Sequence, residues 1–449
     1  MAFLLALSLV VACFASKKMS TQQNVTPFFP GPVVRYCLAP LGLVACLMGA
    51  WFSGRIGVAR LLGVYGVLSN VLPAVNEAVR LSPLDSEGYL ARAQAIKNTG
   101  QLQAALPDYE RATALQPNNF ARWSELGGVY DLAGKPDEAI AAVQRAIRIA
   151  PYYAQPRWQL GNLLLRKGQR QAAFAEFRQA VNSDPALVPN AVELAWGAFA
   201  GKAQAVEQVL QPETALARLE LAHVFAARGA VDDAMRVFRA VADTSESTSA
   251  VREKLRTELF QAKHYYEAWE VWAGGRNWGA NAANRGRGAI TDGGFEKQIS
   301  MTETGFGWRV SPEKPTVSVV MDAQNPFAET TSLQIRWDGK SSSSVYTAWQ
   351  LVLIEPNKHY RLSFAARTKE LVSGGLPEVV VLSDFEGQVI AAADLPQGTN
   401  SWQSYTLEFT APATKEVVYL VIRRKSCPVL SCPAFGTAWF DAFSIKANN

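Results

Sequence analysis

The stretch WSELGGVYDLAGKPDEAIAAVQRAIRIAP, Trp123 to Pro151, carries the spacing that decides the fold of this chain. Several of its residues recur at intervals of 34 positions along the sequence. Prolines lie at 83, 117, 151 and 185, alanines at 78, 112, 146 and 180 and at 105, 139 and 173, and glycines at 100, 134 and 168. Four registers that share one period predict a helix–turn–helix repeat.

The residue types within one repeat explain why two helices can pack as a pair. Small side chains at Gly127 and Ala139 allow two antiparallel helices to approach closely. Leu126 and Tyr130 are expected to fill the space between that pair and the next. Pro151 ends the repeat, because proline cannot continue a helix.

These residues resemble the signature of the tetratricopeptide repeat family, which is carried here by Trp123, Leu126, Gly127, Tyr130, Ala139, Ala146 and Pro151. The resemblance implies three repeats over 86–187, degenerate repeat-like helices over 188–272, and a helical lead-in or worn first repeat over 55–85. It further implies an α-solenoid whose concave face binds a protein partner. The neighbouring copies depart from the signature, with Arg92 in place of a leucine and Arg157 at the aromatic position.

Two apolar runs, Ala2–Ala15 and Val33–Phe52, precede the repeats. Only the second has the length of about 20 residues that a membrane-spanning helix needs. We expect a membrane anchor within residues 1–54, formed by one or two apolar segments. A lipid anchor on Cys13 or Cys46 is the alternative, because each follows a short apolar phrase like a lipoprotein cleavage site.

The charges near these runs indicate an orientation. Lys17 and Lys18 lie between the two runs and Arg35 at the near edge of the second, and the positive-inside tendency places them in the cytoplasm. The soluble part would then be periplasmic or extracellular. Arg55 and Arg60, just after the second run, favour the opposite orientation.

Composition narrows the classes of function. The chain has 449 residues, of which 49 % are hydrophobic and 18 % charged, so two or three domains with real cores are expected. The net charge is only +5 and no long basic run occurs, so we expect no nucleic-acid partner. There is no nucleophile turn, phosphate-binding glycine loop or zinc helix, and the three histidines lack metal-ligand spacing. We therefore expect a protein that is not an enzyme.

The character of the sequence changes after the helices. Residues 273–288, AGGRNWGANAANRGRG, are rich in glycine and asparagine and predict a flexible linker. After them come at least seven short runs of β-branched and aromatic residues separated by turn residues, which predict an all-β sandwich or jelly roll over 289–449. The fold class is thus multidomain α + β: a transmembrane segment, an α-solenoid and a β-sandwich.

Four phrases of this module resemble carbohydrate-binding modules of the jelly-roll, galactose-binding-like type, namely ITDGGFEK, YRLSFAART, SWQSYTLEFTAP and AWFDAFSI. The resemblance implies contact with a polysaccharide, for which flat aromatic faces are needed. The candidates for sugar stacking are Trp308, Tyr346 and Trp349, with burial in the core as the alternative for each. The resemblance also implies a structural calcium with Glu296 and Asp441 as side-chain ligands, or else two carboxylates that only accept hydrogen bonds.

Cys427 and Cys432 form a close pair in CPVLSCP, and such a pair suits a disulfide in an oxidising compartment, with two free thiols as the alternative. Together these features favour a non-catalytic, membrane-anchored scaffold in bacterial exopolysaccharide or cell-envelope assembly. Its solenoid would bind a protein and its sandwich a glycan. The alternative is a surface or structural assembly subunit whose sandwich mediates protein contacts and binds no sugar.

Overall fold

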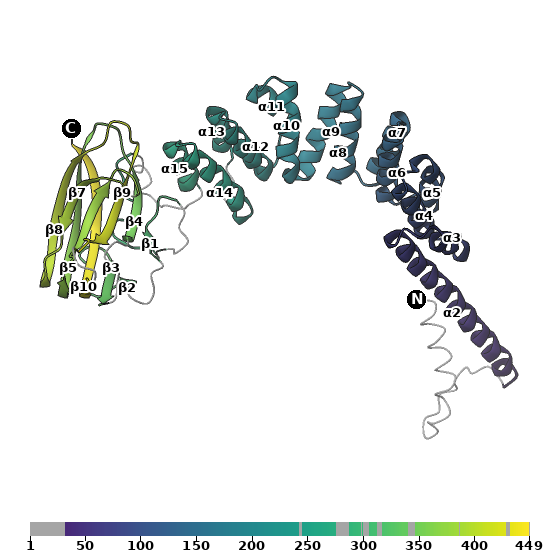
Figure 1. Cartoon of the computed structure of the whole chain (residues 1–449), viewed down its shortest axis with the longest axis horizontal. Coiled ribbons are helices and arrows are strands. Elements are labelled where there is room, and N and C mark those ends of the chain that lie inside the picture. Colours follow the sequence, from purple (N-terminus) through teal and green to yellow (C-terminus); the bar gives the residue numbers. More distant parts are fainter. Residues whose placement is uncertain are drawn as a thin grey trace, which may run out of the picture. The chain divides into compact units, whose positions relative to one another are not determined.

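A computed structural model describes residues 32–241, 245–274, 287–297, 299, 305–311, 317–339, 346–385, 387–427 and 432–448. Helices run as far as Gly274, and strands follow from Arg309 onward (Figure 1). A helical repeat region followed by an all-β sandwich, as the sequence predicts, is therefore confirmed. The chain forms two compact units that divide after Leu187, with residues 208–211 joining the first unit. This division lies well before the segment 273–288 that was expected to be the linker.

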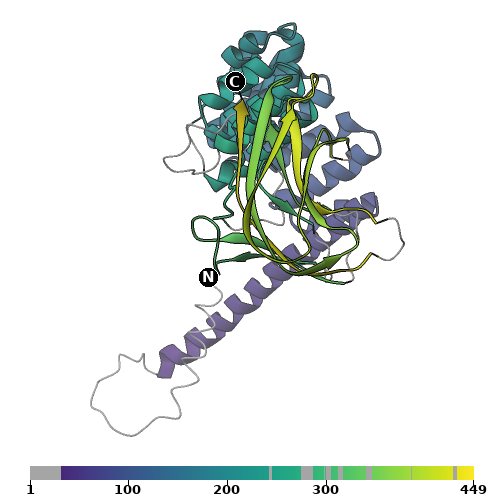
Figure 2. The ribbon, with the colours of Figure 1, turned by 90° about the vertical axis from the view of Figure 1, so that its left-hand side faces the viewer.

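The first unit begins with α2, a helix of 37 residues from Pro32 to Leu68. It is a single straight helix in both ribbon views (Figures 1 and 2) and continues past Phe52, where the expected apolar run ends. It stops before Asn70, whose φ of 53° turns the chain into α3, Leu72–Leu81. The lead-in expected over 55–85 is thus the second half of α2 together with α3. The apolar run Ala2–Ala15 and Cys13 lie outside the described residues.

Three helix pairs follow, and their bounds are α4 Ser86–Asn98, α5 Leu102–Leu115, α6 Phe120–Leu132, α7 Pro136–Ile149, α8 Ala154–Arg166 and α9 Arg170–Ser183. Side-chain oxygens of Asp85 and Asn119 cap α4 and α6 by accepting hydrogen bonds from the amides of Glu87 and Ala121. The turns between paired helices use Gly100, Gly134 and Gly168, whose φ values of 80°, 73° and 77° favour glycine. The 34-residue period of the sequence is therefore the spacing of these glycine turns along the chain.

The second unit starts with six more helices, preceded by the short 3-10 turn η1, Pro185–Leu187. Their bounds are α10 Val188–Ala198, α11 Ala203–Leu210, α12 Ala215–Ala227, α13 Val231–Arg239, α14 Glu246–Gln261 and α15 Tyr265–Gly274. Small residues again allow close packing, and Ala217, Ala222 and Ala234 are fully buried. These helices occupy the region expected to hold degenerate repeats.

The β-sandwich consists of two five-stranded sheets with antiparallel neighbours. The first sheet has the order β1 Arg309–Val310, β4 Tyr346–Leu353, β9 Val417–Arg424, β6 Pro377–Leu382 and β7 Val389–Asp394. The second has the order β2 Val317–Asp322, β3 Ser332–Asp338, β10 Ala434–Asn448, β5 His359–Ser373 and β8 Gly398–Thr410. Alternate residues of both sheets meet in one apolar core, for example Ile335, Phe364, Val379, Leu420 and Phe440.

An aromatic contact ties the start of the sandwich to the last two helices of the same unit. Phe306 is only 2 % exposed, and its ring lies 6.4 Å from that of Phe260 on α14 and 5.8 Å from that of Trp272 on α15. A side chain at Gly305 would collide with Trp272, 2.0 Å away. This packing explains why α10–α15 and the sandwich belong to one compact unit.

Candidate functional site

The repeat signature is used for packing within and between helix pairs. A Cβ atom at Gly127 would lie 2.4 Å from Val143 Cγ2, so only glycine lets α6 approach α7 this closely. Ala139 and Ala146 are fully buried and Leu126 nearly so. The polar ends of the aromatic residues are also occupied, because Trp123 Nε1 donates to the carbonyl oxygen of Pro117 at 2.9 Å and Tyr130 Oη to Glu110 Oε1 at 2.8 Å.

A first candidate surface lies on the first helices of the pairs, α4, α6 and α8. Ion pairs link these helices from one repeat to the next, between Arg122 and Glu87 at 2.6 Å and between Arg166 and Asp131 at 2.5 Å. Gln159 Nε2 adds a hydrogen bond to the carbonyl oxygen of Ser124 at 2.9 Å. Charged and amide side chains therefore link α4 to α6 and α6 to α8, in each case between residues 35 positions apart.

A second candidate surface is an aromatic cluster on the outer face of the first sheet. Phe385, which follows β6 and is 41 % exposed, lies at its centre. Its ring is 5.0 Å from Tyr346, 5.8 Å from Trp349 and 5.5 Å from Tyr419. These three residues are half-buried and pack on Val380, Leu382 and Val421. We call Tyr346, Trp349, Phe385 and Tyr419 the aromatic cluster.

Polar groups border the aromatic cluster. Arg423 forms an ion pair with the buried Glu378 at 2.9 Å, and Lys415 forms one with Asp384 at 2.6 Å. Burial raises the pKa of the Tyr419 phenol, with a smaller contribution from nearby Tyr265, so its hydroxyl stays protonated and can both donate and accept. Flat rings beside hydroxyl, guanidinium and carboxylate groups are the arrangement that sugar recognition uses.

The structure places the three expected sugar-stacking residues differently. Tyr346 and Trp349 both belong to the aromatic cluster, because a register shift between Tyr346 and Ala348 brings the two rings to one face. Trp308, in contrast, is 4 % exposed and lies in the sandwich core, 5.0 Å from Phe295. It has no open ring face for a ligand, and its Nε1 donates to the carbonyl oxygen of Asp292.

Sequence reasoning missed two members of the aromatic cluster. Tyr419 alternates with the core residues Val418 and Leu420 on β9, so strand parity alone could have placed it on the outer face. Phe385 lies in a loop, where no periodicity operates, and only the folded chain brings it to the sheet.

The two expected calcium ligands meet at the loop between β2 and β3. Glu296 Oε1 accepts hydrogen bonds from the amides of residues 330 and 331 at 3.0 Å, and Asp441 Oδ2 from those of residues 327 and 328 at 2.8 and 2.9 Å. A calcium ion needs six to eight oxygen ligands. Among the described residues no three His, Cys, Asp or Glu side chains form a group that could hold a metal. As placed, both carboxylates accept hydrogen bonds from the backbone amides of this loop, as in the alternative given by the sequence analysis.

The environment of these carboxylates affects their pKa values in opposite directions. Burial acts to raise the pKa of Glu296, but the hydrogen bonds from Thr330 and Thr331 outweigh it, so this pKa lies below its usual value. Burial raises the pKa of Asp441 despite its hydrogen bonds to backbone amides. Glu296 is therefore the carboxylate whose ionised form the fold favours.

Comparisons with known proteins identify the helical part. The family model described as tetratricopeptide repeat matches residues 90–154 and again 154–187. The helical repeats of this chain are tetratricopeptide repeats. The matched residues are those in which the 34-residue period is regular.

Curated relatives match this chain over about a fifth to a quarter of its length. DnaJ homolog subfamily C member 3 of Rattus norvegicus is 28 % identical over 101 residues, which are 22 % of this chain and 20 % of that protein. The chain thus matches about a fifth of that relative's length. Among solved structures, that of MamA covers 43 % of this chain and 90 % of its own at 15 % identity, with a TM-score of 0.26. A CBM4 structure covers 35 % of this chain and 99 % of its own at 15 % identity, with a TM-score of 0.27. Structural similarity at TM-scores this low says nothing about what the chain binds.

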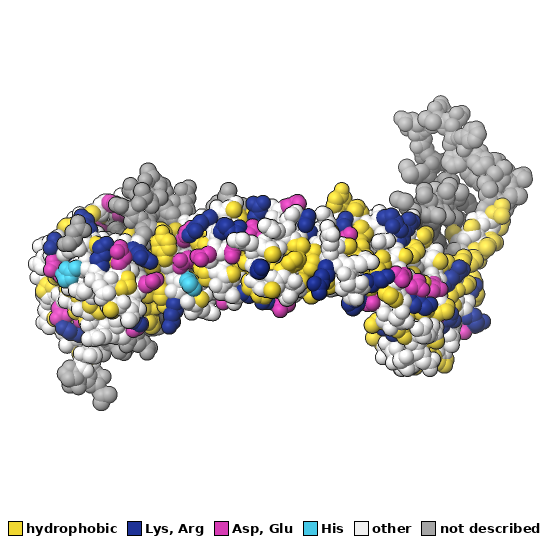
Figure 3. Space-filling view, turned by 90° about the horizontal axis from the view of Figure 1, so that it is seen from above, with side chains coloured by type: hydrophobic (Ala, Val, Ile, Leu, Met, Phe, Trp, Pro, Cys, Tyr) yellow, Lys and Arg dark blue, Asp and Glu magenta, His cyan; other side chains and the backbone are white. Residues whose placement is uncertain are grey.

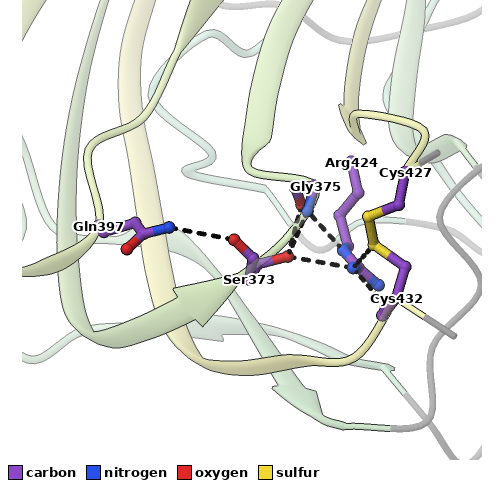
Figure 4. Close-up of a disulfide and its surroundings, with 6 residues drawn as sticks. All are labelled: Ser373, Gly375, Gln397, Arg424, Cys427 and Cys432. Carbon is purple, nitrogen blue, oxygen red and sulfur yellow. Dashed lines mark hydrogen bonds between the residues drawn. A yellow bond between two sulfur atoms is a disulfide. The ribbon is translucent and has the colours of Figure 1, made fainter. Parts of the chain in front are cut away.

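Cys427 and Cys432 form a disulfide, with their Cα atoms 5.9 Å apart (Figure 4). Beside it Arg424 is 2 % exposed, and its guanidinium donates to the carbonyl oxygens of Gly375 and Cys432 and to Ser373 Oγ. A buried guanidinium needs such partners, because an unsatisfied buried charge is very costly. The disulfide and Arg424 together hold the ends of β5 and β9 and the segment before β10 at this edge of the sandwich.

Proposed function

We propose that this chain is a non-catalytic, membrane-anchored scaffold whose tetratricopeptide repeats bind a protein partner and whose β-sandwich binds a glycan. The proposal rests on one observation: the residues of the repeat signature pack the helix pairs together. The signature residues Gly127, Ala139 and Ala146 are used for packing, so the exposed side chains of α4, α6 and α8 are left for a partner. Proteins built from such repeats generally use this surface for protein binding.

The aromatic cluster supports the glycan part of the proposal. Trp349 and Tyr419 offer ring faces, and the exposed Phe385 ring joins them into one surface bordered by ion pairs. A pyranose ring can stack on such a surface while its hydroxyl groups reach the bordering polar groups. The likeness of the sandwich sequence to carbohydrate-binding modules points the same way. Export of exopolysaccharide or assembly of the cell envelope is the setting that would use both surfaces.

Anchoring is proposed from α2. Residues Pro40–Leu68 form a stretch long and apolar enough to cross a membrane. The disulfide Cys427–Cys432 supports an oxidising compartment for the sandwich, which is the periplasm or the cell exterior. This orientation agrees with the cytoplasmic placement of Lys17, Lys18 and Arg35.

The glycan proposal can be tested with the full chain in lipid nanodiscs and a panel of soluble polysaccharides in affinity electrophoresis. We expect retardation by at least one polysaccharide and its loss in Phe385→Ala and Trp349→Ala. Phe435→Ala is the matched control, because Phe435 is an exposed aromatic residue, 51 % accessible, on the other sheet. Absence of retardation across the panel, or equal loss in the control, would contradict the glycan proposal.

One observation favours the alternative function, in which the sandwich contacts a protein and no sugar. Phe435 and Val372 are paired neighbours on the second sheet, and they are 51 % and 61 % exposed. Adjacent exposed apolar side chains are typical of a protein interface. If Phe435→Ala abolishes assembly of the protein into larger complexes and Phe385→Ala does not, the alternative is favoured.

A further inference from the structure

The two sulfur atoms of the disulfide Cys427–Cys432 have different surroundings. Arg424 Nη2 donates a hydrogen bond to Cys432 Sγ at 3.2 Å and another to the carbonyl oxygen of the same residue at 2.7 Å. Figure 4 shows the guanidinium between the Ser373 hydroxyl and the Cys432 sulfur. Cys427 Sγ instead lies close to the turn of residues 374–376, between β5 and β6. In the described part of the chain the disulfide therefore has a cation beside Cys432.

The fold holds this cation in place. Lys and Arg side chains are spread over the surface (Figure 3), whereas Arg424 is only 2 % exposed. Its Nε donates to the carbonyl oxygen of Gly375 at 3.3 Å, and its Nη2 to Ser373 Oγ at 3.1 Å. A guanidinium keeps its charge at every pH at which the protein is folded, and a charge acts more strongly where water is excluded. Arg424 is thus a permanent and immobile positive charge beside Cys432.

The charged residues next to Arg424 in the chain are paired with carboxylates. Arg423 forms an ion pair with Glu378 at 2.9 Å, and Lys425 forms one with Asp394 at 2.6 Å. Since successive side chains of a strand point to opposite faces, Arg423 also lies on the other face of β9 from Arg424. Neither of these pairs carries a net charge, so the field of Arg424 at the sulfur is left in place.

This asymmetry matters when the disulfide is attacked by a thiolate. A neighbouring arginine stabilises a cysteine as its thiolate. In thiol–disulfide exchange the sulfur that forms the more stable thiolate leaves faster, and the attack falls on the other sulfur. A thiolate on Cys432 would accept the hydrogen bond that Arg424 already donates to this sulfur, so no rearrangement is needed. Cys432 is therefore the better leaving group, and Cys427 is the sulfur that is attacked.

The turn between β5 and β6 leaves the disulfide open to a reactant. Cys427 and Cys432 are both half-buried, so neither is sealed in the core. Among the described residues, a Cβ atom at Gly374 would meet only the two sulfur atoms, 3.3 Å from Cys427 Sγ and 3.9 Å from Cys432 Sγ. Any larger side chain at position 374 would cover the disulfide. Gly375, in contrast, is needed by the fold, because its Cβ atom would lie 2.1 Å from the carbonyl oxygen of Lys425.

We infer that Cys427–Cys432 is a site of thiol–disulfide exchange, at which an external dithiol attacks Cys427 and Arg424 holds the departing Cys432 thiolate. The attacking thiolate forms a bond to Cys427 Sγ while the bond between the two cysteines breaks, and the electron pair of that bond leaves on Cys432. The second thiol of the dithiol gives its proton to water and displaces Cys427, which takes up a proton. The protein disulfide gains two electrons, and the dithiol is oxidised to its own disulfide.

The exchange frees Cys427 while the chain around Cys432 stays in place. Arg424 still donates to the carbonyl oxygen of Cys432, and Ala434 remains paired with Ser373 at the start of β10. The segment after β9 loses its covalent link, so Cys427 is the residue that carries the mixed disulfide. This site is separate from the aromatic cluster and from the surface of α4, α6 and α8.

Mapping of the mixed disulfide tests the direction of attack. In the full chain in lipid nanodiscs, Cys13, Cys37 and Cys46 are replaced by serine and the native disulfide is treated with glutathione, a monothiol. Excess N-ethylmaleimide then blocks the sulfur that has left, and mass spectrometry of the peptides locates the glutathione. We expect about tenfold more glutathione on Cys427 than on Cys432. Equal labelling, an excess on Cys432, or a disulfide that reacts only after urea unfolds the sandwich would each overturn the inference.

Rates of reduction by dithiothreitol separate this inference from a purely structural role of Arg424. If Arg424 only supports the fold, Arg424→Met should loosen this edge and speed reduction. The inference predicts the reverse, a rate about tenfold lower, because the departing thiolate loses its cation. Arg424→Lys, which keeps the charge, should stay within about threefold of wild type.

Lys425→Met is the matched control, because it removes a neighbouring cation that pairs with Asp394, and it should leave the rate unchanged. A faster or unchanged rate in Arg424→Met, or equal slowing in Lys425→Met, would contradict the role of Arg424. Mapping of the mixed disulfide changes no residue at the site, so it decides the inference even where Arg424→Met does not fold.

Discussion

Two adjacent glycines on α6 should respond to alanine with opposite signs. A Cβ atom at Gly127 would lie 2.4 Å from Val143 Cγ2 and 3.2 Å from the carbonyl oxygen of Ala139. Val143 is β-branched and fully buried, so its side chain has little freedom to move aside. At Gly128 the nearest atom is Gln159 Nε2, 3.4 Å away at the end of a flexible side chain. An added methyl group would therefore overlap a rigid, buried side chain at position 127 but would make an ordinary van der Waals contact at position 128.

The magnitudes follow from two opposing terms. Overpacking of a tight core costs roughly 1–3 kcal/mol. Replacing glycine by alanine inside a helix contributes about 1 kcal/mol of stability. Because Val143 has little freedom to move aside, the overpacking cost at Gly127 should lie in the upper half of that range, about 2–3 kcal/mol. Less the helix term, Gly127→Ala should destabilise the α6–α7 pair by a net of about 1–2 kcal/mol, which is a factor of roughly 5–30 in the equilibrium between closed and open states. Gly128→Ala retains only the favourable term and should stabilise the same pair by up to about 1 kcal/mol.

Hydrogen exchange of the full chain, followed by mass spectrometry, can measure both effects locally. This choice avoids the assumption of two-state unfolding, which chains of several domains and repeats violate. Amides of α6 and α7 should exchange roughly 5–30 times faster in Gly127→Ala and more slowly in Gly128→Ala. Amides of the β-sandwich, which is a separate packing unit, serve as the internal reference. Slower exchange in Gly127→Ala, or the same sign at both positions, would refute the packing argument.

Three further predictions concern the sandwich. Glu296→Gln should reduce the thermal stability of the sandwich at neutral pH. Because the pKa of Glu296 is lowered in the folded state, the difference from wild type should be complete above about pH 4.5 and should shrink as the pH falls below that value. Melting curves between pH 3 and 7 will measure this difference. Reduction of Cys427–Cys432, or replacement of both cysteines by serine, removes the closed loop that restricts the unfolded chain. The free energy of unfolding in urea should therefore fall by about 2 kcal/mol, and an unchanged midpoint would contradict this prediction. Arg424→Leu leaves the carbonyl oxygens of Gly375 and Cys432 without this donor and should cost about 2–4 kcal/mol, whereas Arg361→Leu, at an exposed ion pair, should cost no more than about 1 kcal/mol in the same assay.

The pairing of the helices could be read from the sequence because its cause is local. A glycine at each turn and a small residue at each helix crossing recur with the period of the repeat, so Gly134, Gly127 and Ala139 mark the pairs without knowledge of distant contacts. The strands of the sandwich were equally accessible, since alternation of residue types within a few positions marks them. The disulfide pair Cys427–Cys432 is close in sequence and needed no long-range information.

Other features were decided only by the tertiary structure, because their causes lie far apart in the chain. Trp308 is buried because Phe295 and Phe443, which are 148 residues apart, close over it. Phe385 joins the aromatic cluster from a loop, and a register shift turns Tyr346 toward it. The sequence by itself determined which segments become helices and strands, since neighbouring residues set their periods. Which faces those elements leave open depends on packing between distant segments, and only the folded chain specifies that.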